Sequence, residues 1–170
     1  MQKKLLKLLY LTSWLLIPPA AQAQQSDCGF IQNPDRQAYC SAISGGGSSH
    51  CRFIREPDLQ ARCRAETGGG SSQCGFIRDR DMQAACRASA DRANSSNTSG
   101  ASSQCGFIQE ANYRSLCRAL ADKNVGQCGF INDNDLRSMC RALAGSDKSQ
   151  CGFITNSDQR AMCRALSVAR

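Results

Sequence analysis

Twelve cysteines are the residues in this chain whose type and spacing could do chemistry. They form six pairs, with eleven residues between the members of each pair. The pairs are Cys28 and Cys40, Cys51 and Cys63, Cys74 and Cys86, Cys105 and Cys117, Cys128 and Cys140, and Cys151 and Cys163. Such thiols could form disulfides, hold soft metal ions such as Cu(I) or Zn(II), or carry out redox catalysis. Neither Cys-x-x-Cys nor Cys-x-Cys occurs, which argues against redox catalysis and against compact thiolate cages.

The start of the chain favours disulfides among these three. Lys3, Lys4 and Lys7 precede a short apolar stretch, and the sequence then reads Ala-Gln-Ala up to Ala23. This pattern is typical of a secretory signal peptide, with cleavage near Ala23. We therefore expect residues 1–23 to be removed and the mature chain to be secreted or periplasmic, in a bacterium. An even set of cysteines in an exported chain predicts a disulfide framework.

The repeat indicates how the cysteines pair. The least demanding arrangement joins the two cysteines of each unit. Residues twelve apart in one continuous helix lie about 18 Å apart along its axis, whereas a disulfide needs Cα atoms within about 7 Å. The chain must therefore turn back inside each unit, and the sequence predicts a small helical hairpin of about 23 residues.

The last two units show the elements of the predicted hairpin. A second helix over residues 134–144 has one apolar face, and a shorter first helix covers about 146–154. Asp or Asn residues at the start of the second helix suit its cap and first turn, where the helix dipole favours them. Each first cysteine is followed two residues later by a phenylalanine and then by an isoleucine, and we expect both to face the second helix. Gly152, after a first cysteine, is expected to let the partner helix approach closely.

The spacing of the units predicts the domain organisation. Residues 24–91 hold three repeats with Gly/Ser linkers, 92–104 form an Asn/Ser-rich linker, and 105–170 hold three more repeats. We predict an all-α tandem array of six hairpins, which could stack as a small α-solenoid. Leu120, Leu143 and Leu166 are matched in the early units by Ile43, Glu66 and Ser89. The later half is therefore expected to be the more compact, and the earlier half to resemble beads on a string.

The remaining polar residues predict no enzyme. The only histidine, His50, takes a position where other units carry Gln or Asp, and paired acids such as Asp79 and Asp81 recur at helix starts. A catalytic centre would be a single constellation and not a repeated one. We therefore expect no catalytic residue, no cofactor and no dedicated metal site.

A row of arginines is the candidate binding feature. They follow the second cysteines of five units and are Arg64, Arg87, Arg118, Arg141 and Arg164. Such a row could hold an unknown protein or an anionic surface ligand, although complementing the helix dipole would also explain it. The net charge of +7 falls to about +4 without the signal lysines, which argues against nucleic acid as the partner. No later stretch could span a membrane.

The leading hypothesis is an exported, non-enzymatic, cysteine-rich repeat protein that acts as a binding scaffold. A protein that sequesters copper or zinc through reduced cysteines is the alternative, and a secreted effector or hydrolase ranks below both.

Overall fold

The computed structural model describes residues 27–94 and 98–168, so the predicted signal peptide lies outside the described residues. The described elements are helices, with no strand among them. The six disulfides join the pairs expected from the repeat, with Cα–Cα distances of 5.6 to 5.7 Å. The prediction of an all-α array of disulfide-pinned hairpins is confirmed.

Each hairpin consists of a short first helix and a longer second helix. The second helices are α3 (Pro34–Ser41), α4 (Pro57–Arg64), α5 (Arg80–Asn94), α7 (Ala111–Asp122), α8 (Asn134–Gly145) and α9 (Ser157–Val168). The first helices are the 3₁₀ helices η3 (Ser48–Phe53), η5 (Ser71–Phe76), η6 (Val125–Phe130) and η7 (Lys148–Phe153), and the α-helix α6 (Thr98–Cys105). The first helix of unit one is described only from Asp27. Wide helical turns, η2 (Ala42–Gly46) and η4 (Ala65–Gly69), follow α3 and α4.

The second helices begin where the sequence places cap residues. The side chains of Asn33, Glu56, Glu110 and Asp133 each accept a backbone N–H from the first turn of their helix. Proline takes the first position of α3 and α4, where its missing N–H would have no partner in any case. The hairpin turn is therefore built locally, unit by unit.

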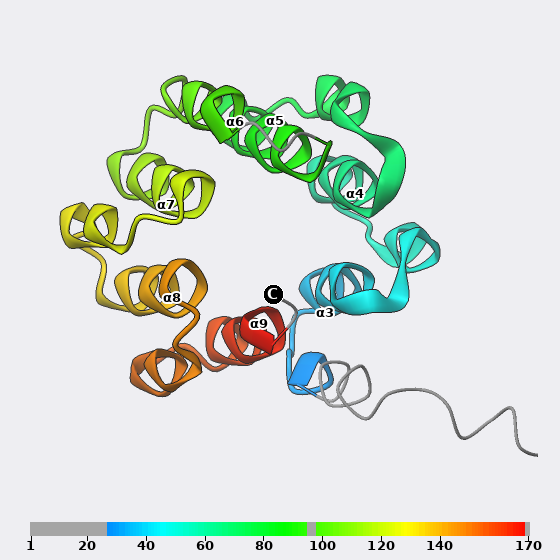
Figure 1. Cartoon of the computed structure of the whole chain (residues 1–170). Coiled ribbons are helices and arrows are strands. Elements are labelled where there is room, and N and C mark those ends of the chain that lie inside the picture. Colours follow the sequence, from blue (N-terminus) through cyan, green and yellow to red (C-terminus); the bar gives the residue numbers. More distant parts are fainter. Residues whose placement is uncertain (1–26, 95–97, 169–170) are drawn as a thin grey trace, which may run out of the picture.

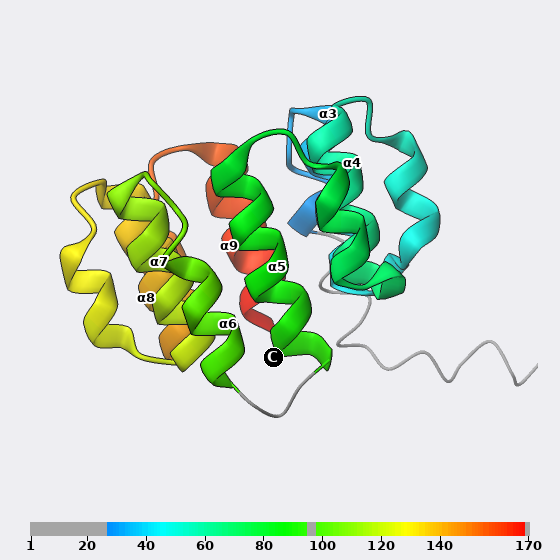
Figure 2. The ribbon, with the colours of Figure 1, turned by 90° about the horizontal axis from the view of Figure 1, so that it is seen from above.

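The six units form a closed ring and not an open solenoid (Figure 1). The second helices make an inner circle and the first helices an outer one. The last second helix, α9, lies beside the first, α3, although the two are at opposite ends of the chain. Figure 2 shows the ring from the side, with the helices of neighbouring units standing next to one another.

A repeated aspartate ties each unit to the next. Asp35, Asp58, Asp81, Asp135 and Asp158 lie in the first turn of their helices, as the sequence predicts for dipole complementation. Their carboxylates accept two backbone N–H groups from the unit that follows. The donors are Arg55 and Glu56, Arg78 and Asp79, Gln109 and Glu110, Thr155 and Asn156, and Gln32 and Asn33. Unit four carries Asn112 instead and accepts only one such bond, from Asn132, at 2.8 Å.

The last of these bonds closes the ring. Asp158 of unit six accepts the N–H groups of Gln32 and Asn33 of unit one at 2.8 and 3.2 Å, across more than a hundred residues of sequence. Ala161, Ala165 and Met162 of α9 pack against the Cys28–Cys40 disulfide and Ile31. We call this junction of units six and one the closing contact. It repeats the contact between units five and six, where Ala142 and Met139 pack against Cys151, Cys163 and Ile154.

The early units pack on one another as the late units do, so the beads-on-a-string expectation is wrong for the described residues. Tyr39 and Ala42 of unit one share a cluster with Cys51, Ile54 and Cys63 of unit two. Ala61 and Ala65 of unit two share another with the Cys74–Cys86 disulfide, Ile77 and Ala90 of unit three. Each unit alone is too small to bury its apolar face, and its neighbour covers the remainder.

The glycine linkers are ordered turns and not loose connectors. Gly45 and Gly68 adopt φ values of 111° and 115°, which L side chains rarely reach. A Cβ atom on Gly46 or Gly69 would lie 2.6 to 2.7 Å from the carbonyl oxygen of Ser41 or Arg64, respectively. The glycines therefore let the chain turn tightly from each second helix into the next first helix. Later units achieve the turn with a single left-handed residue, Lys123 (φ 51°) or Ser146 (φ 56°).

Candidate binding surface

The six phenylalanines lie on the outside of the protein, contrary to the expectation that they face the second helix. Their exposed fractions range from 60% for Phe53 to 73% for Phe30. The isoleucines that follow are buried, as predicted, with at most 3% exposed. The backbone explains the difference: in units two, three, five and six the first helix ends at the phenylalanine, and the isoleucine is extended, with φ near −80° and ψ near 125°. Of two adjacent apolar residues at such a turn, one faces inward and the other outward.

In units three, five and six the glycine before the phenylalanine does not serve a close helix contact. A Cβ atom added to Gly75, Gly129 or Gly152 would meet no other atom within 4 Å. The prediction for Gly152 is therefore wrong. Unit two carries Arg52 at this position, consistent with the open space there.

Phe107 lies where unit four meets unit three. The junction of units three and four holds a pocket lined on one side by Arg80, Gln83, Ala84 and Arg87 of α5. The opposite side is lined by Gln104, Phe107 and Gln109. Arg87 belongs to the predicted arginine row, so an exposed phenylalanine and an exposed arginine share one groove. We call this pocket, together with the corresponding repeat positions at the other five junctions, the Phe–Arg grooves.

All five row arginines are exposed. By position in the repeat, each row arginine corresponds to the phenylalanine of the next unit. The correspondences are Arg64 with Phe76, Arg87 with Phe107, Arg118 with Phe130, Arg141 with Phe153 and Arg164 with Phe30. The last pair belongs to the closing contact, because units six and one are neighbours in the ring.

Another polar position in the grooves has a structural role. The residue three positions before the second cysteine donates a side-chain hydrogen bond to the backbone carbonyl of its own unit's isoleucine, at 2.9 to 3.1 Å. In units two to six these residues are Gln60, Gln83, Arg114, Arg137 and Arg160. These side chains hold the hairpin turn in place. The row arginines, one residue after the cysteine, make no bond of this kind in the described residues and are exposed.

The acidic residues do not neutralise the arginine row. In the described residues the ion pairs are Arg62–Glu66, at 3.0 Å, and Lys148–Asp27, at 3.7 Å. The carboxylates that tie the units together accept backbone N–H groups, and these bonds hold the pKa values of Asp58, Asp81 and Asp135 below their usual range. No ion pair joins the arginine row to the aspartates in the part of the chain that the structure describes.

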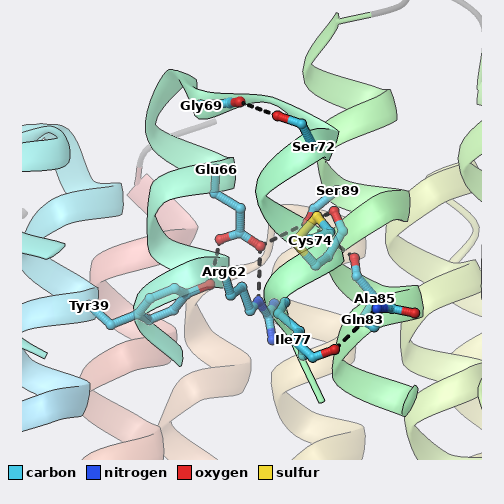
Figure 3. Close-up of a disulfide and its surroundings, with 11 residues drawn as sticks. Tyr39, Arg62, Glu66, Gly69, Ser72, Cys74, Ile77, Gln83, Ala85 and Ser89 are labelled. Carbon is cyan, nitrogen blue, oxygen red and sulfur yellow. Dashed lines mark hydrogen bonds and ion pairs between the residues drawn. A yellow bond between two sulfur atoms is a disulfide. The ribbon is translucent and has the colours of Figure 1, made fainter. Parts of the chain in front are cut away.

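The inner face of the early units carries a buried polar network that the sequence reasoning missed (Figure 3). The Glu66 carboxylate accepts hydrogen bonds from the Tyr39 hydroxyl at 2.5 Å, from Arg62 Nε at 3.0 Å and from the Ser89 hydroxyl at 2.8 Å. Three adjacent second-helix regions thus meet at one carboxylate.

Burial raises the pKa of Glu66, but the Arg62 guanidinium and the three donated hydrogen bonds outweigh burial and hold it below its usual value. Burial raises the pKa of Tyr39 well above its ordinary range. The network is therefore a charged Glu66 with a neutral Tyr39. Because the side chains present already satisfy Glu66, it is a structural element and not a vacant site.

His50 also has a structural position. Its Nδ1 lies 3.0 Å from the carbonyl oxygen of Gly46, inside the turn that joins units one and two. The described residues contain no group of three or more His, Cys, Asp or Glu side chains arranged to hold a metal ion. Among the described helices, none is long and apolar enough to cross a membrane.

Comparison with protein-family models, curated proteins and solved structures gave no match.

Proposed function

We propose that this protein is an exported, non-enzymatic scaffold that binds a partner through the Phe–Arg grooves on the outside of its ring. The observation that carries the proposal is the exposure of all six phenylalanines at equivalent positions. Single exposed apolar residues are ordinary in soluble proteins, but a repeated aromatic row marks an interaction surface.

The energetics support this interpretation. Covering a phenyl ring that is about 70% exposed contributes roughly 1 to 2 kcal/mol. Protein interfaces are enriched in Phe and Arg and depleted in Lys, Glu and Asp in their cores. The grooves combine the two enriched residue types, and the isoleucines already supply the apolar core of each hairpin. The phenylalanines are therefore available for a partner.

Export is supported by the disulfides, which fit an oxidising compartment. The intact mass of the protein collected outside the cytoplasm tests this part. The scaffold predicts a chain that starts at Gln24 and is about 12 Da lighter than its reduced form, because six disulfides remove twelve hydrogens. A full thiol mass with bound copper or zinc would support the metal-sequestering alternative instead.

Photo-crosslinking tests the binding surface. The crosslinking residue p-benzoylphenylalanine is placed at position 107, inside a groove, and in a control protein at position 125. Val125 is an exposed apolar residue (41%) at the start of its first helix, whereas Phe107 follows the end of its own, α6 (Thr98–Cys105). Both proteins are irradiated in the secreted or periplasmic fraction of the producing organism.

A discrete adduct at position 107, absent at 125 and suppressed by excess unlabelled wild-type protein, is expected. The same competitor with serine in place of all six phenylalanines should not suppress it. No adduct at 107, or an adduct that the serine variant suppresses equally, would overturn the proposal.

A further inference from the structure

Resting on the proposed function, we infer that the Phe–Arg grooves bind an acidic polypeptide. In each groove the guanidinium receives a carboxylate of the partner, and the phenyl ring receives an apolar side chain next to it. The inference follows from three properties of the grooves: the kind of cation, its recurrence with the phenylalanine in the repeat, and the apolar ring that accompanies it.

The cation is arginine at all five row positions, and never lysine. A guanidinium presents a planar fork of donors that matches a carboxylate in two parallel hydrogen bonds, whereas a lysine ammonium is a hydrated point charge. Helix-dipole complementation requires only positive charge and would accept either residue. Since the protein's own aspartates bind backbone N–H groups, the forks are available to carboxylates from outside.

The groove between units one and two shows that the cation accompanies the phenylalanine. Unit one has Ser41 where the other units have the row arginine. Unit two, whose Phe53 lies in that groove, has Arg52 where the other units have glycine. The Arg52 guanidinium carbon lies 4.8 Å from the centre of the Phe53 ring. The repeat therefore assigns an arginine to each of the six phenylalanines, although one comes from a different position of the repeat.

The mixture of charge and apolar surface favours a polypeptide over a polyanion. The described pocket is lined by the guanidiniums of Arg80 and Arg87 together with the largely exposed Phe107 ring and the small apolar Ala84. Polyphosphate, nucleic acid or a sulfated glycan would gain from dense charge and leave the rings poorly covered. An acidic segment with interspersed aliphatic side chains satisfies both the ring and the guanidinium.

Closure of the ring makes the grooves multivalent. The ring repeats the groove positions around one body, so a segment that reaches two or more of them binds the second groove at a high effective concentration. A single groove is expected to bind weakly, and a repeated acidic sequence much more tightly.

Binding of synthetic peptides to the full disulfide-bonded protein, measured by calorimetry, tests the inference. The probe is a peptide of repeated Glu-Glu-Leu-Gly. One comparison peptide has glutamine for every glutamate, a second has serine for every leucine, and a third contains a single copy of the motif. Heparin and polyphosphate serve as polyanion probes.

The repeated acidic peptide should bind, and its affinity should fall as salt screens the charges. Each comparison peptide should bind at least roughly tenfold more weakly. Replacing Arg87 by glutamine or Phe107 by serine should lower the affinity up to about fivefold per groove, with larger losses when grooves are combined. Lys123→Gln and Val125→Ser should leave the affinity unchanged, since neither side chain lines the described groove.

Equal binding of the glutamine peptide, or tighter binding of heparin or polyphosphate lost in the same arginine variants, would overturn the acidic-polypeptide inference. In either case, specific crosslinking at position 107 would still support the scaffold. Absence of both crosslinking and peptide binding would overturn the two proposals together.

Discussion

Replacement of Asp158 by alanine should open the ring at the closing contact. The substitution removes the acceptor for the N–H groups of Gln32 and Asn33. Hydrogen bonds of this kind to a charged acceptor contribute a net 1.5 to 3 kcal/mol when buried and less when exposed, and removal of a capping side chain costs about 1 kcal/mol. Because both N–H groups lie at the surface and regain water as a partner, we expect a loss of about 1.5 kcal/mol. The open form should therefore become about tenfold more populated.

Met162 reports this opening. Its side chain is partly buried in the clusters that join α9 to unit one, so hydrogen peroxide should oxidise it faster when the ring opens. In the Asp158→Ala protein we expect the rate of Met162 sulfoxide formation, followed by peptide mass spectrometry, to rise by up to about tenfold. Met139, in the equivalent cluster between units five and six, is the internal control and should keep its rate.

A matched variant separates ring opening from the loss of any inter-unit aspartate. Asp135→Ala removes the same pair of backbone bonds between units five and six, which the chain also connects directly. In this variant the rate of Met139 oxidation should rise much less than the rate of Met162 oxidation does in the Asp158→Ala protein. If the two oxidation rates rise equally, the covalent connection between units five and six does not make their junction harder to open than the closing contact. If Met162 does not accelerate at all, Asp158 does not hold the ring closed.

Three further predictions concern stability, each measured by urea unfolding with the disulfides intact unless stated. Glu66→Leu should destabilise the protein by about 2 kcal/mol, because it leaves the partly buried Arg62 without its ion-pair partner. The double variant Arg62→Met with Glu66→Leu, which copies the residues of unit five, should recover most of the loss. An equal loss in both variants would contradict this account. Asn112→Asp should raise stability by roughly 0.5 to 1 kcal/mol by allowing a second backbone bond like those of the other units, and an unchanged midpoint would show that the second bond contributes nothing. Backbone hydrogen bonds lower the pKa values of Asp58, Asp81 and Asp135 in the folded protein. The stability that these carboxylates contribute is therefore fully present above about pH 4 and should be lost as the pH falls through the lowered pKa values. An unfolding midpoint that stays constant down to about pH 2 would refute this prediction.

The disulfide-pinned hairpin could be predicted from the sequence because its determinants are local. Cysteine spacing, cap residues such as Asn33 and Asp133, and the apolar face of residues 134–144 all act within one unit. The exposed phenylalanines could not be predicted in this way, because Gly-Phe-Ile does not reveal which apolar residue faces inward until the end of the first helix is known. An indirect signal was present: the buried side of a 23-residue hairpin has little room for both side chains.

The ring and the inner network depend on contacts between units. Asp158 repeats the residue that binds the next unit, and its partners are the N–H groups of Gln32 and Asn33 in unit one, a contact that no single repeat reveals. Glu66 and Ser89 looked like weak substitutes for leucine because each was compared only with its own position in the repeat. Tyr39 and Arg62, at a different repeat position on neighbouring helices, complete the network.

Closure also constrains how this protein can evolve. Open repeat arrays lengthen or shorten by duplicating or deleting units, and their terminal repeats carry a polar face that shields the exposed ends of the core. Here Ala161, Ala165 and Met162 of the last unit are covered by the first, so neither end needs such a cap. A chain with five or seven of these units could not bring Asp158 to Gln32 and Asn33 with the same curvature, and both ends of its core would meet water. The number of units is therefore fixed by the geometry of the junctions, and single residues are freer to change than whole repeats.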